Sequence, residues 1–474
     1  MDRRVVDALR AIVGPRGLIE PGTRALPYES DGLAIYAQRP ELVLLPADTA
    51  ETAACMKILH DAGVPIVPRG AGTGLAGGAT PVAGGVIVGT ARMRRVLELD
   101  VENRRARVEA GLVNVDLTHA CKSHGLYYAP DPSSQQACTL GGNVANNSGG
   151  PHCFKHGNTS QHVLGLLIVQ HDGTLLDLTA PRLDPLGYDL VGLFVGSEGM
   201  FGIATELVVR LVPEAPVVET FLGIFATLEA ACDSVSDIIA ARLEPSALEI
   251  LDRLTIEAVE ASVFAAGYPR EAEAVLLVEV EGSEPEVAGC ARAVRAILEQ
   301  RGALSVHSAR DAAARKKLWA GRKGAFGAMG RVAPDLYVAD AVVPRTKLRE
   351  LVLRTVEIAR AHKLRLATVF HAGDGNLHPN ICYDRRDKDE LARVLAAGDE
   401  MLELCVQAGG ALTGEHGVGL EKQQQMHYLF SDADLRQMCR ARDAWDPARR
   451  LNPGKLIPVR VCEEMRAGSV PEGA

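Results

Sequence analysis

Two histidines and one carboxylate of this 474-residue chain stand in glycine-rich segments, in a pattern that could bind a divalent metal. His371 and His378 flank a glycine turn that follows an apolar run, so both rings can converge on one point. Glu415 lies in a second glycine-rich stretch, residues 409–419. Two imidazoles and one carboxylate leave positions on Zn²⁺, Mn²⁺ or Fe²⁺ open for a substrate. A lone histidine is more often a polar residue with an internal partner, but three such groups together predict a metal site.

A glycine-rich segment nearer the N-terminus could hold phosphate oxygens. Residues 69–78 contain the literal pattern G-x-G-x-x-G at 72–77. The dinucleotide fingerprint of that form needs a helix to begin on the loop, and Pro81, Gly84 and Gly85 exclude one here. We expect a nest of backbone N–H groups instead. A merely tight loop is the alternative, although five glycines between residues 70 and 78 are more than a turn requires.

Two further polar segments rich in glycine, residues 130–150 and 196–203, lie in the same half of the chain. Glycine lets the backbone approach a ligand closely because no Cβ intervenes. Three such loops in one domain suggest one long ligand that crosses all of them.

Short apolar runs punctuated by glycine and proline predict strands of a mixed sheet in the first half. These runs are residues 41–46, 64–68, 85–88, 163–170 and 205–213. Between the first two, Asp48 and Glu51 form a capping box for a helix that stops at Gly63, which predicts a βαβ unit.

The pattern changes after Pro213 to strands that alternate with long helices. The predicted strands lie in residues 221–228, 274–282, 336–344 and 364–381, and the helices end near Arg242 and Arg301 or cross 385–408. A second α+β domain is therefore expected to begin near residue 214.

Composition limits the class of protein. Hydrophobic residues make up 47% and aromatic residues 4% of the chain, which is typical of a globular protein with an aliphatic core. The 60 acidic and 51 basic residues give a net charge of −9, which disfavours nucleic-acid or anionic-membrane partners. Ten scattered cysteines without a C-x-x-C pair predict reduced thiols in a cytoplasmic protein and no iron–sulfur cluster. No apolar run is long enough to span a membrane, and Asp7 and Arg10 interrupt any signal peptide.

Three long blocks of sequence resemble a known flavoprotein superfamily. PRGAGTGLAGG, DPSSQQACTLGGNVANNSGGPHCFKHGNT and VGSEGMFGIATELVVRLVP are similar to the FAD-binding domain of the vanillyl-alcohol oxidase/p-cresol methylhydroxylase superfamily, in its glycolate oxidase FAD-subunit and D-lactate dehydrogenase branch. The resemblance covers essentially residues 40–458. It implies an α+β fold: an N-terminal helical segment (1–39), a two-part FAD-binding domain of the p-cresol methylhydroxylase type (40–213), a ferredoxin-like C-terminal cap domain (214–458) and a flexible tail (459–474).

The resemblance also implies non-covalent FAD and the residues that hold it. These are Pro68, Arg69, Gly70, Ala71, Gly72, Thr73, Gly74, Gly77, Gly78, Pro130, Asp131, Pro132, Ser134, Gly141, Gly142, Asn143, Ala145, Asn146, Ser148, Gly149, Gly150, Glu198, Gly199, Gly202, Ile203 and Asn452. For Asn452 an ordinary helix stop is an equal alternative. One departure is His156, where relatives carry tyrosine in K-Y-G.

The metal and base motifs of the family, H-x-G-D-G-N-L-H and G-E-H-G, match here as well. The match implies His371, His378 and Glu415 as ligands of a divalent metal, Zn with Mn or Fe as alternatives, and His416 as the general base. Arg322 matches the arginine that binds the substrate carboxylate, although a solvated helix residue is nearly as good an interpretation. Relatives that act on larger diacids carry a lysine where this chain has residues 338–341, a departure that favours a small monocarboxylate.

The implied function is FAD-dependent oxidation of a small D-2-hydroxy acid, glycolate or D-lactate, to the 2-oxo acid by hydride transfer to flavin N5. The alternative is a non-redox flavin transferase of the alkylglycerone-phosphate synthase type. Expected partners are the 2-hydroxycarboxylate substrate and either companion flavin-type and iron–sulfur subunits or another electron acceptor, with a homodimer left open. The expected location is the cytoplasm, with peripheral attachment to the inner membrane through partner subunits.

Overall fold

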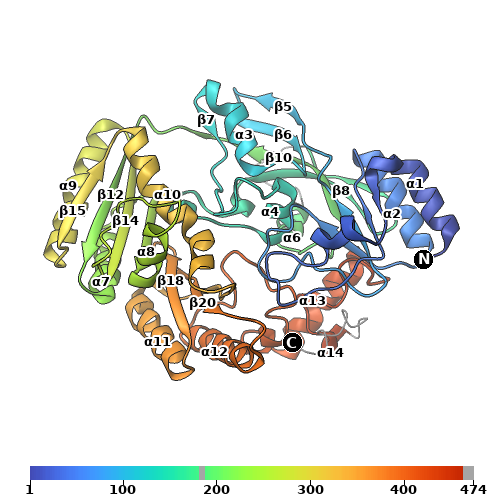
Figure 1. Cartoon of the computed structure of the whole chain (residues 1–474). Helices are drawn as coiled ribbons and strands as arrows, with labels where there is room; N and C mark the ends of the chain where they lie inside the picture. The colour runs from blue at the N-terminus through green and yellow to red at the C-terminus, as the bar shows by residue number, and fades with distance from the viewer. Residues whose placement is uncertain (181–186, 463–474) are drawn as a thin grey trace. The chain divides into compact units, whose positions relative to one another are not determined.

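The computed structural model describes residues 1–180 and 187–462, and Figure 1 labels many of its helices and strands. Two compact units form from segments that alternate along the chain. The first unit comprises residues 1–149, 157–214 and the segment from 415 onward, and the second comprises 150–156 and 215–414. The units thus place residues 415–458 with the N-terminal part of the chain, whereas the resemblance implies that they belong to the C-terminal domain.

A four-stranded sheet opens the first unit in the order β1 (Leu18–Ile19), β2 (Leu42–Leu44), β4 (Val86–Gly89) and β3 (Ile66–Arg69). β2, β4 and β3 run parallel, and α1 (Arg3–Gly17) and α2 (Thr49–Asp61) pack on them. The Asp48 carboxylate caps α2 by accepting from the backbone N–H of Glu51. The predicted βαβ unit is therefore confirmed, with β4 between its two strands.

The other predicted strands of the first half form a separate antiparallel sheet, so the expectation of one mixed sheet is wrong. Its order is β5 (Val96–Asp100), β6 (Arg105–Glu109), β10 (Ile203–Arg210), β8 (Val163–Val169) and β9 (Leu175–Asp177). Its apolar face has its own core, which an apolar run alone does not assign to one sheet or another. The remaining elements of the unit are α3 (Asn114–Cys121), β7 (Leu126–Tyr127), α4 (Leu140–Asn146), α6 (Leu190–Phe194), β11 (Val212–Pro213), α13 (Asp432–Trp445) and α14 (Val459–Cys462).

The second unit is built on an antiparallel sheet. Its strands run in the order β15 (Ser305–Ala309), β12 (Val217–Phe225), β14 (Ala274–Gly282), β13 (Ala247–Asp252), β18 (Arg365–His371), β19 (Asn376–Leu377) and β17 (Ala341–Val342), and β20 (Pro379–Tyr383) joins β18 to β16 (Asp335–Val338). One face packs on α7 (Leu228–Ala240), α9 (Glu284–Gln300), α11 (Leu348–Ala361) and α12 (Lys388–Gln407). The other face packs on α8 (Arg253–Glu260) and α10 (Ala312–Ala328), and the short α5 (Cys153–His156) completes the unit. The strand and helix alternation predicted after residue 213 is confirmed.

The face of this sheet that packs on α8 and α10 is apolar at one end of its strands and polar at the other. One end is apolar and includes Leu251, Val275 and Leu277. Register places Glu279 opposite Thr220 and Ala247, and Glu249 opposite His371, so these side chains share the same face beyond the apolar end. The second unit therefore carries a polar cluster at one end of an otherwise apolar interface.

Two of the ten cysteines are paired. Cys439 and Cys462 form a disulfide with a Cα–Cα distance of 5.8 Å, so the prediction that all ten cysteines are reduced is wrong for this pair. The two residues lie 23 positions apart, and only the packing of α14 against α13 brings them together.

Within residues 1–180 and 187–462, no helix is both long enough and apolar enough to cross a membrane. Most of the predicted tail, residues 463–474, lies outside the described residues.

Candidate functional site

The two predicted metal-binding histidines meet on a hairpin. β18 ends at His371, and after a tight turn β19 leads directly into His378. The turn needs Gly375, which has a φ of +79° and whose Cβ, if present, would lie 2.4 Å from the carbonyl oxygen of Val343. The two imidazole rings lie edge to face with their centroids 5.1 Å apart. Both side chains are almost fully buried, so the sequence prediction that they converge agrees with this geometry.

A buried carboxylate that the sequence analysis missed orients one of these rings. Glu249 Oε1 lies 2.8 Å from His371 Nδ1, and Glu249 Oε2 accepts a 2.5 Å hydrogen bond from Arg322 Nε. Burial alone would raise the pKa of Glu249, but Arg322 and His371 lower it overall. The carboxylate is therefore ionised and Nδ1 of His371 carries the proton, which leaves the Nε2 lone pair for a metal.

Arg322 is a buried residue of α10 rather than a solvated helix residue, with 4% of its surface exposed. Besides the Nε bond to Glu249, its Nη2 lies 3.4 Å from His371 Nδ1. A guanidinium is thus fixed beside His371, one of the predicted metal ligands, in the interior of the second unit.

Asp340 is a second carboxylate absent from the predicted site. It is fully buried, and its Oδ1 lies 3.9 Å from His378 Nδ1. Its Oδ2 accepts from Thr413 Oγ1 at 2.5 Å and from the backbone N–H of Gly414 at 3.0 Å. Asp340 therefore fixes the chain up to the residue that precedes Glu415.

Glu415 and His416 begin the segment that belongs to the first unit. The carbonyl oxygen of His416 accepts from Asn146 Nδ2 at 2.8 Å. The fully buried Glu198 accepts from the backbone N–H groups of Val418 at 2.7 Å and Gly419 at 2.8 Å, and burial raises the pKa of Glu198. Asn146 and Glu198, predicted to hold the cofactor, thus use their side chains to support the loop of the predicted base.

The glycine loop after β3 has the predicted form, because no helix occurs between Arg69 and Val86, all of whose residues the structure describes. Gly72 has a φ of +74°, and a Cβ there would lie 2.1 Å from the Arg69 guanidinium. Arg69 donates to the carbonyl oxygens of Ser30, Ala79 and Pro27 at 2.9–3.3 Å. The Arg69 side chain therefore links the glycine loop to residues 27–30 through backbone carbonyl oxygens.

The predicted residue Asn452 ties two of the glycine loops together. Its Nδ2 donates to the carbonyl oxygens of Gly78 at 3.0 Å and Glu198 at 2.7 Å. Lys455, which the sequence analysis missed, is fully buried and donates to Gly78, Thr80 and Asn452 Oδ1 at 2.5–2.7 Å. Burial lowers the pKa of Lys455 to about 7.

The glycine-rich segment 130–150, expected to be a loop, is partly helical. Residues Leu140–Asn146 form the short helix α4, capped by Thr139 Oγ1, which accepts from Gly142 N–H. Asn143 Oδ1 accepts from Asn114 Nδ2, which also donates to the carbonyl oxygen of Pro130. Gly150 belongs to the second unit, whereas the other predicted cofactor residues belong to the first.

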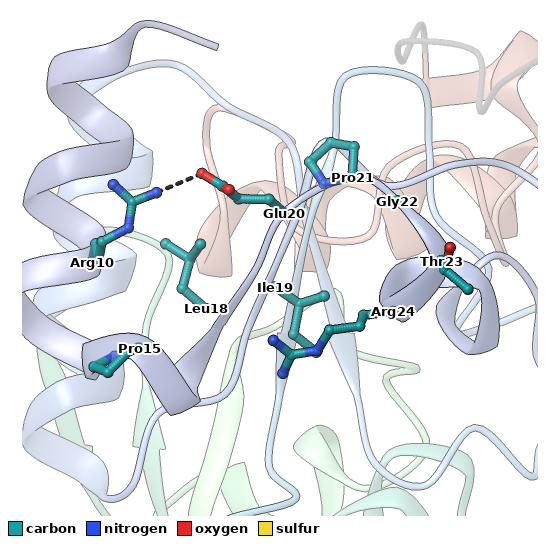
Figure 2. Close-up of a pocket in the computed structure, with 9 residues that line it drawn as sticks. All are labelled: Arg10, Pro15, Leu18, Ile19, Glu20, Pro21, Gly22, Thr23 and Arg24. Atoms are coloured by element: carbon teal, nitrogen blue, oxygen red, sulfur yellow. Dashed lines mark hydrogen bonds and ion pairs between the residues drawn. The ribbon is translucent and has the colours of Figure 1, made fainter.

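A hollow of about 510 Å³ lies elsewhere in the first unit, between α1 and the segment Thr23–Tyr28 (Figure 2). Arg10 and Arg24 line it, and Arg10 forms a 2.5 Å ion pair with Glu20. None of the predicted site residues contributes to this lining.

Two family descriptions match the sequence. "FAD binding domain" matches residues 40–179, and "FAD linked oxidases, C-terminal domain" matches residues 215–456, more than half of the chain. The chain belongs to the FAD-linked oxidase family. This FAD-linked oxidase is 44% identical to the glycolate oxidase subunit GlcD of Escherichia coli (strain K12) over 99% of this chain and 94% of the relative. It is 32% identical to a D-lactate dehydrogenase of Anaerostipes hadrus over 90% and 92% of the two chains.

Solved structures confirm the two-domain flavoprotein fold. p-Cresol methylhydroxylase superimposes with a TM-score of 0.81 at 17% identity over 96% of this oxidase and 97% of that chain. An alkyldihydroxyacetonephosphate synthase gives 0.75 at 19% identity over 96% and 86%. At such identities the likeness concerns the fold alone, so it does not favour the transferase alternative. The ferredoxin-like character of the second unit stays a prediction.

Proposed function

We propose that this FAD-dependent oxidoreductase converts a small D-2-hydroxy acid, with glycolate and D-lactate as the candidates, to the 2-oxo acid. The observation that carries the proposal is the buried cluster in which Glu249 holds both Arg322 and His371. Arg322 offers a cationic donor for the substrate carboxylate, and the oriented ring of His371 offers a ligand for a metal that would polarise the substrate oxygen. The relatives named glycolate oxidase subunit and D-lactate dehydrogenase support the same substrate class.

FAD is proposed to bind non-covalently to the first unit through the glycine loops. His156, the position at which the chain departs from its family, has its Nε2 2.8 Å from Glu281 Oε1, so this nitrogen already has a partner. When bound, FAD supplies the hydride acceptor. Asn452 links the carbonyl groups of Gly78 and Glu198 and so fixes the spacing of two loops that would contact FAD.

The proposed metal ligands are His371, His378 and Glu415, with Zn²⁺ as the first choice and Mn²⁺ or Fe²⁺ as alternatives. The His371 ring fits this role because its Nδ1 proton points to Glu249. A bound divalent metal would supply a Lewis acid for the substrate oxygen. Asp340 holds the amide of Gly414 and so fixes the backbone next to Glu415.

His416 is proposed to remove the hydroxyl proton of the substrate. Histidine is the side chain that most often acts as a general base at neutral pH. Asn146 and Glu198 hold the backbone of its loop at both sides. Arg322 is proposed to bind the substrate carboxylate from its fixed position beside His371.

The electrons are proposed to pass from the flavin either to companion subunits or to another acceptor. The name of the GlcD relative describes a subunit, which supports the presence of companion subunits. Flavin-type and iron–sulfur subunits are the proposed companions, while another acceptor and a homodimer stay open. A cytoplasmic location, with attachment to the inner membrane only through such subunits, belongs to the same proposal.

An anaerobic titration tests the substrate class. Purified flavoprotein is mixed separately with glycolate, D-lactate, L-lactate and D-2-hydroxyglutarate, and flavin absorption is followed. Bleaching by glycolate or D-lactate, with little by the other two, is the expected result. Reduction by none of the four would refute the proposed function.

A further inference from the structure

The short segment 150–156, called the excursion below, places His152, which has no role so far, at the polar end of the second unit. Residues 150–156 belong to that unit, although the chain before and after them belongs to the first. Lys155 Nζ lies 3.1 Å from Glu281 Oε1, which anchors the segment on β14. Phe154 packs so closely on Gly373 that a Cβ there would lie 2.9 Å from the phenyl ring. Because Gly373 lies in the turn between His371 and His378, the excursion lies against the proposed metal turn.

His152 of this excursion is paired with a buried carboxylate. Its Nε2 lies 3.1 Å from Glu279 Oε1. The other carboxylate oxygen of Glu279 accepts from Thr220 Oγ1 at 2.5 Å and from Trp319 Nε1 at 2.7 Å. Burial tends to raise the pKa of Glu279, but the hydrogen bond and charge of His152, followed by the other donors, lower it overall. The imidazole is thus held by an ionised acceptor whose other bonds are satisfied.

This pair repeats the arrangement of Glu249 and His371. In both cases a glutamate of the same sheet face holds one histidine, and α10 supplies a further donor to the carboxylate. Trp319 and Arg322, the two donors, are three residues apart and so lie on one face of the helix. Glu279 opposes Ala247, two positions before Glu249, which makes the carboxylates diagonal neighbours.

Structural stability does not explain this second pair. Buried ion pairs contribute little net stability compared with apolar residues of the same volume, and apolar residues fill the rest of this sheet face. The side chain of His152 is 20% exposed, against 8% for Glu279, so the imidazole lies on the accessible side of the pair. The Trp319 ring lies beside it, with a centroid distance of 5.5 Å.

We propose that His152 is a further substrate-binding residue, which contacts the carboxylate of the 2-hydroxy acid together with Arg322, while Glu279 positions its ring. Trp319, whose ring lies beside that of His152, is part of the same proposal as the apolar side chain that limits the substrate to a short carbon chain. The inference rests on the proposed function for the identity of the substrate. It assigns a specific role to the excursion at 150–156.

The test compares carboxylate binding and turnover in His152→Gln with the wild-type flavoprotein. Oxalate, a dicarboxylate that flavin cannot oxidise in this way, is titrated by calorimetry, and glycolate and D-lactate oxidation is measured with an artificial electron acceptor. We expect the Kd for oxalate and the KM to rise about tenfold, because a charge-assisted hydrogen bond is lost, while kcat changes by less than about threefold. Flavin content should stay at the wild-type level.

His362→Gln is the matched control, because its Nε2 is 2.9 Å from Glu400 in a histidine–carboxylate pair outside this cluster. Glu279→Gln is the second variant, used also if His152→Gln fails to fold, and it should raise the oxalate Kd as well. In the double variant the two effects should not add, since Glu279 acts through His152. An oxalate Kd within about twofold of wild type in either variant, or additive effects, would overturn the proposal. A wild-type protein that binds oxalate but is reduced by no hydroxy acid would instead refute the proposed function alone.

Discussion

Glu249→Gln tests the candidate site most directly. The carboxylate is fully buried between Arg322 Nε at 2.5 Å and His371 Nδ1 at 2.8 Å. The amide leaves the guanidinium buried without a counter-charge, and breaking one partner of a buried ion pair costs about 3–5 kcal/mol of unfolding free energy. The glutamine replaces one of the two accepting oxygens by an NH2 donor. If the remaining oxygen stays with the charged guanidinium, the NH2 group faces Nδ1 of His371 and the ring loses its fixed orientation. Loss of such a partner lowers metal affinity about 10–100-fold.

Two measurements check this expectation: unfolding in guanidinium chloride, and competition for Zn²⁺ between the protein and a chelator. Glu281→Gln is the control. The carboxylate of Glu281, on β14, forms ion pairs with Lys155 and His156 of α5, and these pairs involve neither His371 nor His378. The control is expected to lose stability but keep its zinc affinity. A Glu249→Gln protein that unfolds at the wild-type midpoint and binds zinc as the wild type does would refute the assigned role of Glu249.

The remaining predictions concern the first unit. His416→Ala should retain FAD yet lose most turnover, and unchanged turnover in a rapid-mixing assay would contradict its role as the base. Gly72→Ala should lose FAD affinity, because a Cβ would collide with Arg69 at a φ of +74°, and a spectral titration with FAD that matches wild type would contradict this. For Lys455, the folded pKa of about 7 lies below the unfolded value, so the unfolded state binds more protons above pH 7 and wild-type stability should rise with pH. Between pH 7.5 and 9.5 the gain is about 2.5 kcal/mol at most, and Lys455→Met should remove it; identical pH slopes in denaturant unfolding would contradict the prediction.

Local patterns in the sequence predicted the parts of the fold that depend on neighbours along the chain. The βαβ unit follows from the cap at Asp48 and the stop at Gly63, and the meeting of His371 and His378 follows from a turn only a few residues long. The division of the first half into two sheets depends on strand pairing over long sequence distances, which apolar runs do not encode.

The carboxylates that orient the site could not be placed in the same way. Glu249 meets His371 only because β13 pairs with β18, 122 positions later in the chain. One signal was available: a glutamate inside an apolar strand, as in ALEILD and AVLLVEVEG, is rare in a core unless it is paired. That signal marks Glu249 and Glu279 as partners of something, but only the register of the sheet identifies the partner.

The segment that carries the proposed base is held at both ends by buried carboxylates that accept backbone N–H groups. Asp340 of the second unit holds Gly414, and Glu198 of the first unit holds Val418 and Gly419. Only residues 415–417 lie between these anchors, and they include the proposed third ligand and the proposed base. Each carboxylate therefore fixes the backbone on one side of these residues through contacts within its own unit. Neither carboxylate needs to contact a substrate, because each acts through the backbone beside the proposed third ligand and the proposed base.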